Sequence, residues 1–207
     1  MWFRKLSRDG NARGAKLTLG IASALALGLS LAACGASYVE NSTAAVILVI
    51  QNINKGAPLL SDVRSGQDGD TIINCATTLT LESRPKNPKS NVGPSEDVQI
   101  TGYQVAYSRS DGRGAQGVDV PYTINGNISA LVTSGGTSST DVSIDIVRHQ
   151  AKLEPPLSNI NGLQIVTMFA DVTIYGHTIS GQNVSAEASA QVTFADFATG
   201  TPTCEGS

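Results

Sequence analysis

The segment Val184–Phe194 reads VSAEASAQVTF, and its apolar and polar residues alternate without interruption. Every second residue of a β-strand points to the same face of the sheet, so this alternation places apolar side chains on one face and polar side chains on the other. A helix would instead repeat its apolar residues every three or four positions. The segment therefore predicts a strand with one buried face and one face in water.

The same two-residue period recurs along most of the chain after residue 44. A change of apolar parity across Gly102 predicts a β-bulge there, and residues 176–182 are expected to join the last two strands as a hairpin. No convincing amphipathic helix occurs, and Thr, Ser and Val dominate, as β-propensity favours. We expect seven strands, within residues 44–53, 72–81, 98–107, 128–132, 142–147, 166–175 and 184–194.

Seven strands separated by turn signals predict an all-β fold, an immunoglobulin-like antiparallel two-sheet sandwich. The only tryptophan is Trp2, near the start of the chain. The buried core Trp of antibody domains is therefore missing, and the term describes the architecture alone.

The chain begins with the layout of a secretory signal peptide, in which a basic segment precedes an apolar stretch from Leu17 to Ala33. That stretch is short of the about 20 residues that span a bilayer. The motif Leu31-Ala32-Ala33-Cys34 resembles the bacterial lipobox, in which the cysteine receives a diacylglycerol and cleavage occurs just before it. An ordinary cleavage site with a chance cysteine is the alternative. We expect Cys34 to become the first residue of a lipoprotein anchored by fatty acyl chains such as palmitate.

Removal of the signal peptide, residues 1–33, leaves a short lipidated tether, 34–43, and one domain, 44–207. The tether reaches at most about 30 Å. The leader holds five of the 14 Lys and Arg and one of the 17 Asp and Glu, so the mature chain has nine basic and sixteen acidic residues, a formal charge of −7. Nucleic acid or anionic lipid would call for a basic patch, and we expect neither as a partner.

Two cysteines remain after lipidation, Cys75 and Cys204. Export permits a disulfide between them. A bridge that closes more than a hundred residues would stabilise the fold by about 5 kcal/mol on the chain-entropy account. The alternative is a buried free Cys75 and an unpaired Cys204, and the sequence does not decide between the two.

Few residues are typical of a metal or catalytic site. His149 and His177 have no partner at ligand spacing. Asp62, Asp68 and Asp70 lie close together among glycines as a candidate calcium loop, although the closing glutamate of an EF-hand is missing. No G-x-S-x-G elbow, phosphate-binding loop or dinucleotide fingerprint occurs. We expect no enzyme activity and no cofactor.

Two loops are expected to carry positive charge, one after the second predicted strand and one after the third. Simple strand counting places them at opposite ends of the sandwich. They are candidate binding loops for an acidic partner, with solubility and edge protection as the alternative. Their charged residues are Arg84, Lys86 and Lys89 in the first loop and Arg109, Asp111 and Arg113 in the second.

Several short segments resemble those of a known family. They are LLSDV (59–63), RPKNP (84–88), RxDGR (109–113), GVDVPY (117–122) and HQAKLEPPL (149–157). Together they resemble a family of uncharacterised, hypothetical bacterial lipoproteins with an all-β domain, over residues 46–197. The resemblance implies the same fold and the same lipid-anchored location, and it implies no activity, substrate or catalytic residue.

We expect a lipoprotein anchored in the outer membrane, on its periplasmic or cell-surface face, that acts as a structural or protein-binding module for an unidentified envelope protein. Gly35 favours this membrane, because Gram-negative lipoproteins retained at the inner membrane carry an aspartate at that position. The alternative is a ligand-binding or calcium-dependent adhesion module for a surface glycan. The residues available for sugar stacking are then Tyr103, Tyr107, Tyr122 and Tyr175.

Overall fold

The computed structural model describes residues 43–64, 73–136, 138–197 and 204–205 of the 207-residue chain. The signal peptide and the lipidated Cys34 lie outside the described residues, as do Asp68 and Asp70 of the candidate calcium loop. In the part of the chain that is described, no helix has both the length and the apolar character needed to span a membrane.

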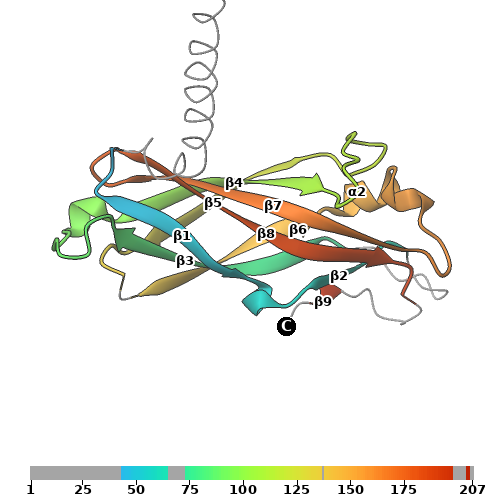
Figure 1. The fold of residues 1–207 in the computed structure, drawn as a ribbon, viewed down its shortest axis with the longest axis horizontal. Coiled ribbons are helices and arrows are strands. Elements are labelled where there is room, and N and C mark those ends of the chain that lie inside the picture. The colour runs from blue at the N-terminus through green and yellow to red at the C-terminus, as the bar shows by residue number, and fades with distance from the viewer. Residues whose placement is uncertain (1–42, 65–72, 137, 198–203, 206–207) are drawn as a thin grey trace, which may run out of the picture. The chain divides into compact units, whose positions relative to one another are not determined.

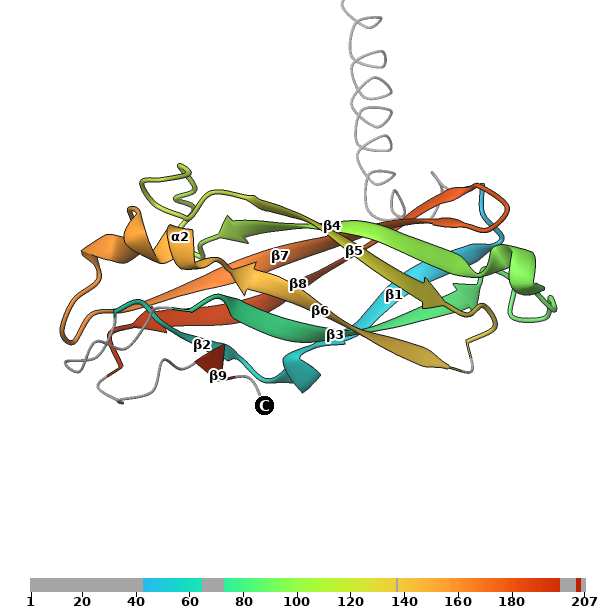
Figure 2. The ribbon, with the colours of Figure 1, turned by 180° about the vertical axis from the view of Figure 1, so that it is seen from behind.

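The described residues form a two-layer β-sandwich (Figure 1, Figure 2). The smaller sheet has the strand order β1-β3-β6, and the larger has the order β5-β4-β7-β8-β2-β9. The prediction of an all-β, two-sheet sandwich is confirmed. The strands are β1 (Val46–Ile53), β2 (Leu59–Asp62), β3 (Cys75–Pro85), β4 (Val98–Ser108), β5 (Ile124–Val132), β6 (Ser139–Val147), β7 (Ile165–Thr178), β8 (Asn183–Ala195) and β9 (Cys204–Glu205).

The structure adds elements that the two-residue period did not reveal. Strand β2 has four residues, of which Leu59, Ser61 and Asp62 are buried; because Ser61 and Asp62 are adjacent and polar, it lacks the apolar alternation of a half-buried strand. It pairs in parallel with β8, whereas the sequence predicted antiparallel pairing throughout. Within the described residues, one short helix, α2 (His149–Leu153), and three 3₁₀ turns also occur: η1 (Asn54–Gly56), η2 (Pro94–Glu96) and η3 (Leu157–Asn159).

Some predicted boundaries also move. Strand β3 begins at Cys75 and runs to Pro85, later than expected, and β7 continues to Thr178. The connection between β7 and β8 therefore spans four residues, 179–182, and Gly176 lies inside a strand. Strand pairing along the whole length of β8, from Ile165↔Ala195 to His177↔Asn183, extends β7 beyond its apolar run.

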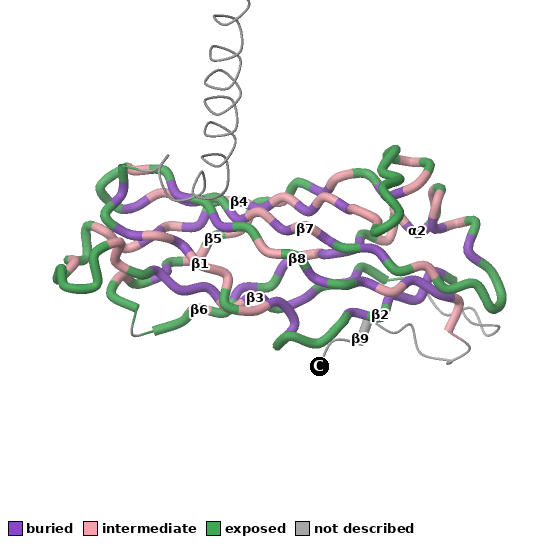
Figure 3. Tube along the Cα trace, in the orientation of Figure 1, coloured by how far each residue is buried: buried purple, intermediate pink, exposed green. Residues whose placement is uncertain are grey.

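The core is formed by buried apolar residues from both sheets. Figure 3 shows buried residues alternating with more exposed ones along the strands. From the larger sheet come Met168, Val172 and Ile174 of β7 and Val192 and Phe194 of β8, each fully buried. The facing row of the smaller sheet includes Val46, Leu79, Leu81 and Ile146, also fully buried. Each such side chain contributes roughly 1.5–3 kcal/mol by leaving water, which explains why the period-two pattern decides the fold.

The bulge expected at Gly102 is confirmed. The register of β4 shifts between Ile100 and Gly102 against both neighbours, β5 and β7. Gly176 of β7 faces this point opposite Ile100. A Cβ atom at Gly176 would lie 2.6 Å from the carbonyl oxygen of Gln99, so the close approach of the two backbones requires glycine here.

The sandwich has two ends, which we name by residues found at them. At the Thr43 end, the backbone N of Ala45 donates to a carboxylate oxygen of Glu96 (3.2 Å), and Ile179 N donates to Asp97 O (2.9 Å), so the chain entry, the 86–97 connection and the β7–β8 turn lie together. The α2 end holds α2, η3 and residues 109–123. Figures 1 and 2 show the two candidate binding loops at opposite ends, as strand counting predicted.

Candidate functional site

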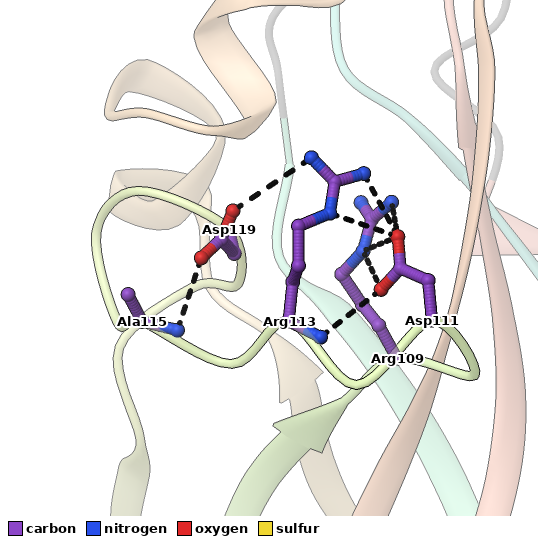
Figure 4. A network of polar contacts seen from close by, with 5 residues as sticks. All are labelled: Arg109, Asp111, Arg113, Ala115 and Asp119. Carbon is purple, nitrogen blue, oxygen red and sulfur yellow. Dashed lines mark hydrogen bonds and ion pairs between the residues drawn. The ribbon is translucent and has the colours of Figure 1, made fainter.

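A charged network occupies the loop that follows β4 at the α2 end (Figure 4). The carboxylate of Asp111 accepts hydrogen bonds from Arg109, with the shortest from Nη2 at 2.7 Å, and from Arg113, with Nη2 at 2.8 Å and Nε at 2.9 Å. These two guanidinium groups, that of Arg109 first, hold the pKa of Asp111 far below its usual range. Arg113 also approaches Asp119, with 4.0 Å between Nη1 and Oδ1.

The network changes the expected role of this loop. Two arginines are balanced by two aspartates, and the turn is closed by the backbone bond from Gly112 N to Arg109 O (3.2 Å). The Asp119 carboxylate also accepts from Ala115 N (3.3 Å). Because the cations are engaged within the loop, it presents little net charge to an acidic partner.

At the Thr43 end, Arg84 has a similar internal partner. Its Nη2 donates to Oε2 of Glu82 at 2.7 Å, and the Glu82 side chain is only 7% exposed. The hydrogen bond from Arg84 lowers the pKa of Glu82. Gln51 donates to the same carboxylate oxygen. Lys86 and Lys89 follow in the adjoining loop, and Lys89 is exposed. The guanidinium of Arg84 is thus engaged by a carboxylate of its own strand.

The α2 end carries a concentration of exposed apolar side chains. Among the residues that the structure describes, eleven large apolar side chains are exposed, and six of them belong to this end. Leu163 is fully exposed, and Val118 and Ile165 are each 68% exposed. We call this set the α2-end apolar group; it consists of Ile73, Val118, Tyr122, Leu153, Leu163 and Ile165.

Side chain to backbone hydrogen bonds hold the segments of this end in place. His149 N donates to Oδ1 of Asn74 (2.7 Å), and Arg64 Nε donates to Ile160 O (2.9 Å). Arg148 Nη2 donates to Asn125 O (2.6 Å), which joins the start of α2 to the start of β5. The loops at this end are therefore fixed to the strands that support them.

The α2-end apolar group was not recognised from the sequence. A signal for it exists, because Val118 and Leu163 are apolar residues within turn-rich stretches, GVDVP and NGLQ, that belong to no alternating run. Apolar residues in such places have no sheet face to bury them. Only the strand order shows that segments more than ninety residues apart along the chain reach the same end.

A buried polar cluster lies beneath α2. Lys152 is 2% exposed, and its Nζ lies 3.9 Å from Sγ of Cys75. Burial lowers the pKa of Lys152 to about 8, against the attraction of the Asp62 carboxylate. Asp62 is itself buried in β2 and accepts a hydrogen bond from Arg64 N (3.1 Å). This carboxylate is therefore part of the interior, which is unlike an exposed calcium loop.

No group of three or more His, Cys, Asp or Glu side chains that could hold a metal ion occurs within the described ranges. Two of the four tyrosines considered for sugar stacking are core residues. Tyr107 donates its hydroxyl to Ile146 O, and Tyr103 accepts from Asp145 N (3.3 Å), so both join the two sheets. Burial raises the pKa of Tyr107. Tyr122 and Tyr175 are exposed.

The backbone brings the two remaining cysteines near one residue of β2. Cys204 of β9 lies opposite Ser61 in the antiparallel pair of β2 and β9. Sγ of Cys75 lies 3.3 Å from Oγ of Ser61. Segments 129 positions apart in the sequence thus meet at the same point of the larger sheet.

No family model matches the chain, and no curated protein matches its sequence. The resemblance to bacterial lipoproteins stays a prediction from the quoted segments.

Proposed function

We propose that this chain is a lipid-anchored protein of the cell envelope whose sandwich binds a protein partner through its α2 end, without catalysis. The observation that carries the proposal is the position of the α2-end apolar group. It lies opposite the end where the domain begins at Thr43, nine residues after Cys34. An anchor attached at Cys34 would hold the Thr43 end near the membrane, since the tether spans at most about 30 Å.

The composition of the α2 end supports protein binding. Soluble proteins expose single apolar residues everywhere, but a group of them at one place is typical of an interaction surface. Protein interfaces combine an apolar centre that includes aromatic residues with a polar rim. At the α2 end, Tyr122 and the aliphatic side chains are accompanied by the Arg109–Asp111–Arg113 network. The paired charges suit a rim, where they contribute specificity more than affinity.

The membrane assignment rests on the lipobox and on Gly35. Lipid at Cys34 with more than one acyl chain gives stable anchoring. By resemblance to Gram-negative lipoproteins, the absence of an aspartate after Cys34 directs the protein to the outer membrane. In cell fractionation, we expect wild-type protein in the membrane pellet and the Cys34→Ser variant outside it. A Cys34→Ser variant that stays in the washed pellet would contradict the anchor.

The binding surface is tested in the acylated protein in its own cells. A photoreactive amino acid placed at Leu163, in the α2-end apolar group, should give a discrete crosslinked adduct to an envelope protein. The matched control is the same amino acid at Ile179, which is 59% exposed at the Thr43 end. Identical adducts from both positions, or no adduct from Leu163, would refute binding through the α2 end.

We also propose a disulfide between Cys75 and Cys204. Both residues lie next to Ser61, and cell-envelope proteins outside the cytoplasm can keep disulfides. The bridge would fasten the end of the chain to the edge of the larger sheet.

A further inference from the structure

A groove of about 380 Å³ lies beside the link between β1 and β2. Its walls are residues 50–53 of β1, residues 56–58 of the link and residues 188–191 of β8. None of these residues is charged. Pockets that bind ligands have volumes of roughly 300–1,000 Å³, so the groove is large enough for a short piece of polypeptide.

The groove exists because the chain changes sheets between β1 and β2 (Figure 1). In the turn between them, Asn54, Lys55 and Gly56 have positive φ angles of 52°, 53° and 81°. The Nδ2 group of buried Asn54 donates to Ala57 O (2.8 Å) and holds the turn closed. Two successive left-handed residues other than glycine cost energy, so the surrounding contacts must enforce the change of sheet.

Strand β2 covers only the last four residues of β8. Its register begins with Leu59 opposite Val192 and ends with Asp62 opposite Ala195. Within the described ranges, no strand pairs with this side of β8 before Val192. In an antiparallel pair, every second residue directs its N–H and C=O away from the partner strand. Two of the four residues at 188–191 therefore turn these groups away from β7, toward the groove.

Parts of two other strands on the larger sheet's sides, β2 and β5, are covered. Strand β9 pairs with the outer side of β2. On the edge of β5, Arg148 Nη2 donates to Asn125 O (2.6 Å), and Thr140 Oγ1 donates to Leu131 O (3.2 Å). Natural sheets guard their edges by such cover or with charged residues and proline. Residues 188–191 of β8 are Ala, Ser, Ala and Gln, so this stretch of edge carries neither a charge nor a proline, and residues 50–53 of β1 lie across the groove from it without pairing with it.

We propose that the groove binds an extended peptide segment with small, uncharged side chains, which adds a strand to β8 at residues 188–191. Backbone hydrogen bonds supply the affinity in this mode of recognition, and the walls select the side chains. The uncharged lining disfavours a Lys or Glu side chain, because a charge taken from water there would lack a partner. Strand β2 is the precedent, since it occupies the next four residues of the same edge in extended form. The inference is independent of the α2 end and of the lipid anchor.

The test uses the full acylated chain in detergent and the probe peptide acetyl-Thr-Val-Thr-Val-Thr-amide at millimolar concentration. Hydrogen exchange of the backbone amides should slow at residues 188–191 and stay unchanged at the β7–β8 turn. Gln191→Trp fills the groove and should weaken protection by roughly tenfold, the size expected for a residue central to an interface. Ser185→Trp lies on the same exposed face of β8 outside the groove and should bind as wild type does.

Two N-methylated versions of the probe provide the decisive comparison. One is methylated on its first, third and fifth residues and the other on its second and fourth. Every second residue of the bound peptide would direct its N–H group toward β8, and N-methylation removes that donor. Only the version whose methyl groups lie on the residues that face away from β8 should still slow hydrogen exchange. Protection by both, by neither, or no protection by the parent peptide overturns the proposal. If hydrogen exchange at the same residues slows without peptide as the protein concentration is raised, the edge binds a second copy of the chain instead.

Discussion

Lys152 combines a charged group with an interior position. Its ammonium lies beneath α2, near Sγ of Cys75 and the carboxylate of Asp62. Burial lowers its pKa to about 8, and the attraction of Asp62 opposes this effect only in part. A lysine in an unfolded chain has a pKa of about 10.4. The folded protein therefore releases this proton at lower pH than the unfolded chain does.

Because the folded protein loses the Lys152 proton at lower pH than the unfolded chain does, the free energy of unfolding should rise with pH. Between about pH 8 and pH 10, the unfolded chain binds more protons, so the free energy of unfolding should increase by about 2–3 kcal/mol. Below this interval both states carry the charge, and the folded state bears the full cost of burying it. Urea unfolding across the interval measures the change. The buried hydroxyl of Tyr107, with its raised pKa, affects stability only at higher pH.

Lys152→Met should remove the rise, because the group whose pKa differs between the folded and unfolded states is gone. Its stability near neutral pH should not exceed that of wild type, because the substitution leaves the buried Asp62 carboxylate without the attraction of the ammonium. Lys89→Met is the matched control, since Lys89 is exposed, and it should keep the rise. A wild-type profile that is flat in this interval would show that the folded state does not lower the pKa of Lys152.

Strand β4 illustrates how one extra residue shapes an element. Thr101 lies between Ile100 and Gly102, where the register shifts; it is an extra residue of β4 relative to β7, whereas relative to β5 the extra residue lies in β5. The close approach at this point is accommodated by Gly176 in β7. The sequence revealed the bulge, because a change of apolar parity is local. It did not reveal Gly176 as its counterpart, because the pairing of β4 with β7 joins residues more than seventy positions apart.

Gly176→Ala should lower the free energy of unfolding by about 1–3 kcal/mol, the range for overpacking a filled interior. The added methyl group would meet the carbonyl oxygen of Gln99 at 2.6 Å, and backbone atoms cannot move aside as a flexible side chain would. Gly93→Ala is the control, since no heavy atom lies within 4 Å of its added methyl group. Denaturant midpoints compare the two variants. If Gly176→Ala and Gly93→Ala lowered the free energy of unfolding equally, the close contact at the bulge would not be the cause.

Across the whole molecule, the end of the chain returns to the sheet that contains β2. Strand β9 pairs with β2, whose Ser61 lies beside both Cys75 and Cys204. A disulfide here would close a loop of well over a hundred residues. Such a loop strongly restricts the unfolded chain.

Cys204→Ser should therefore lower the free energy of unfolding by about 2–4 kcal/mol under oxidising conditions. Reductant should lower the free energy of unfolding of wild type to that of Cys204→Ser, and it should leave the value for Cys204→Ser unchanged. Mass spectrometry of the unreduced mature protein should find peptides joined through Cys75 and Cys204. Two thiols that react with alkylating reagent in native, oxidised protein would refute the bridge.

Local pattern alone was enough to predict the fold class, most strands and the bulge. Alternation in segments such as Val184–Phe194 depends only on which residues leave water, and burial dominates the energetics of folding. The predicted lipid attachment of Cys34 is local in the same sense, because it depends on the four residues of its motif. Strand β2, with adjacent buried Ser61 and Asp62, has no such pattern and was missed.

The tertiary structure decided how these elements meet. It paired Arg84 with Glu82 and the loop arginines with Asp111, so cations expected to face a partner are engaged internally. It placed the α2-end apolar group together from loops remote in sequence, and it opened the groove where β1 and β2 change sheets. The reason is that hydrogen-bonded strand order and end-to-end loop proximity are long-range contacts, whereas a residue pattern reports only on its own neighbourhood along the chain.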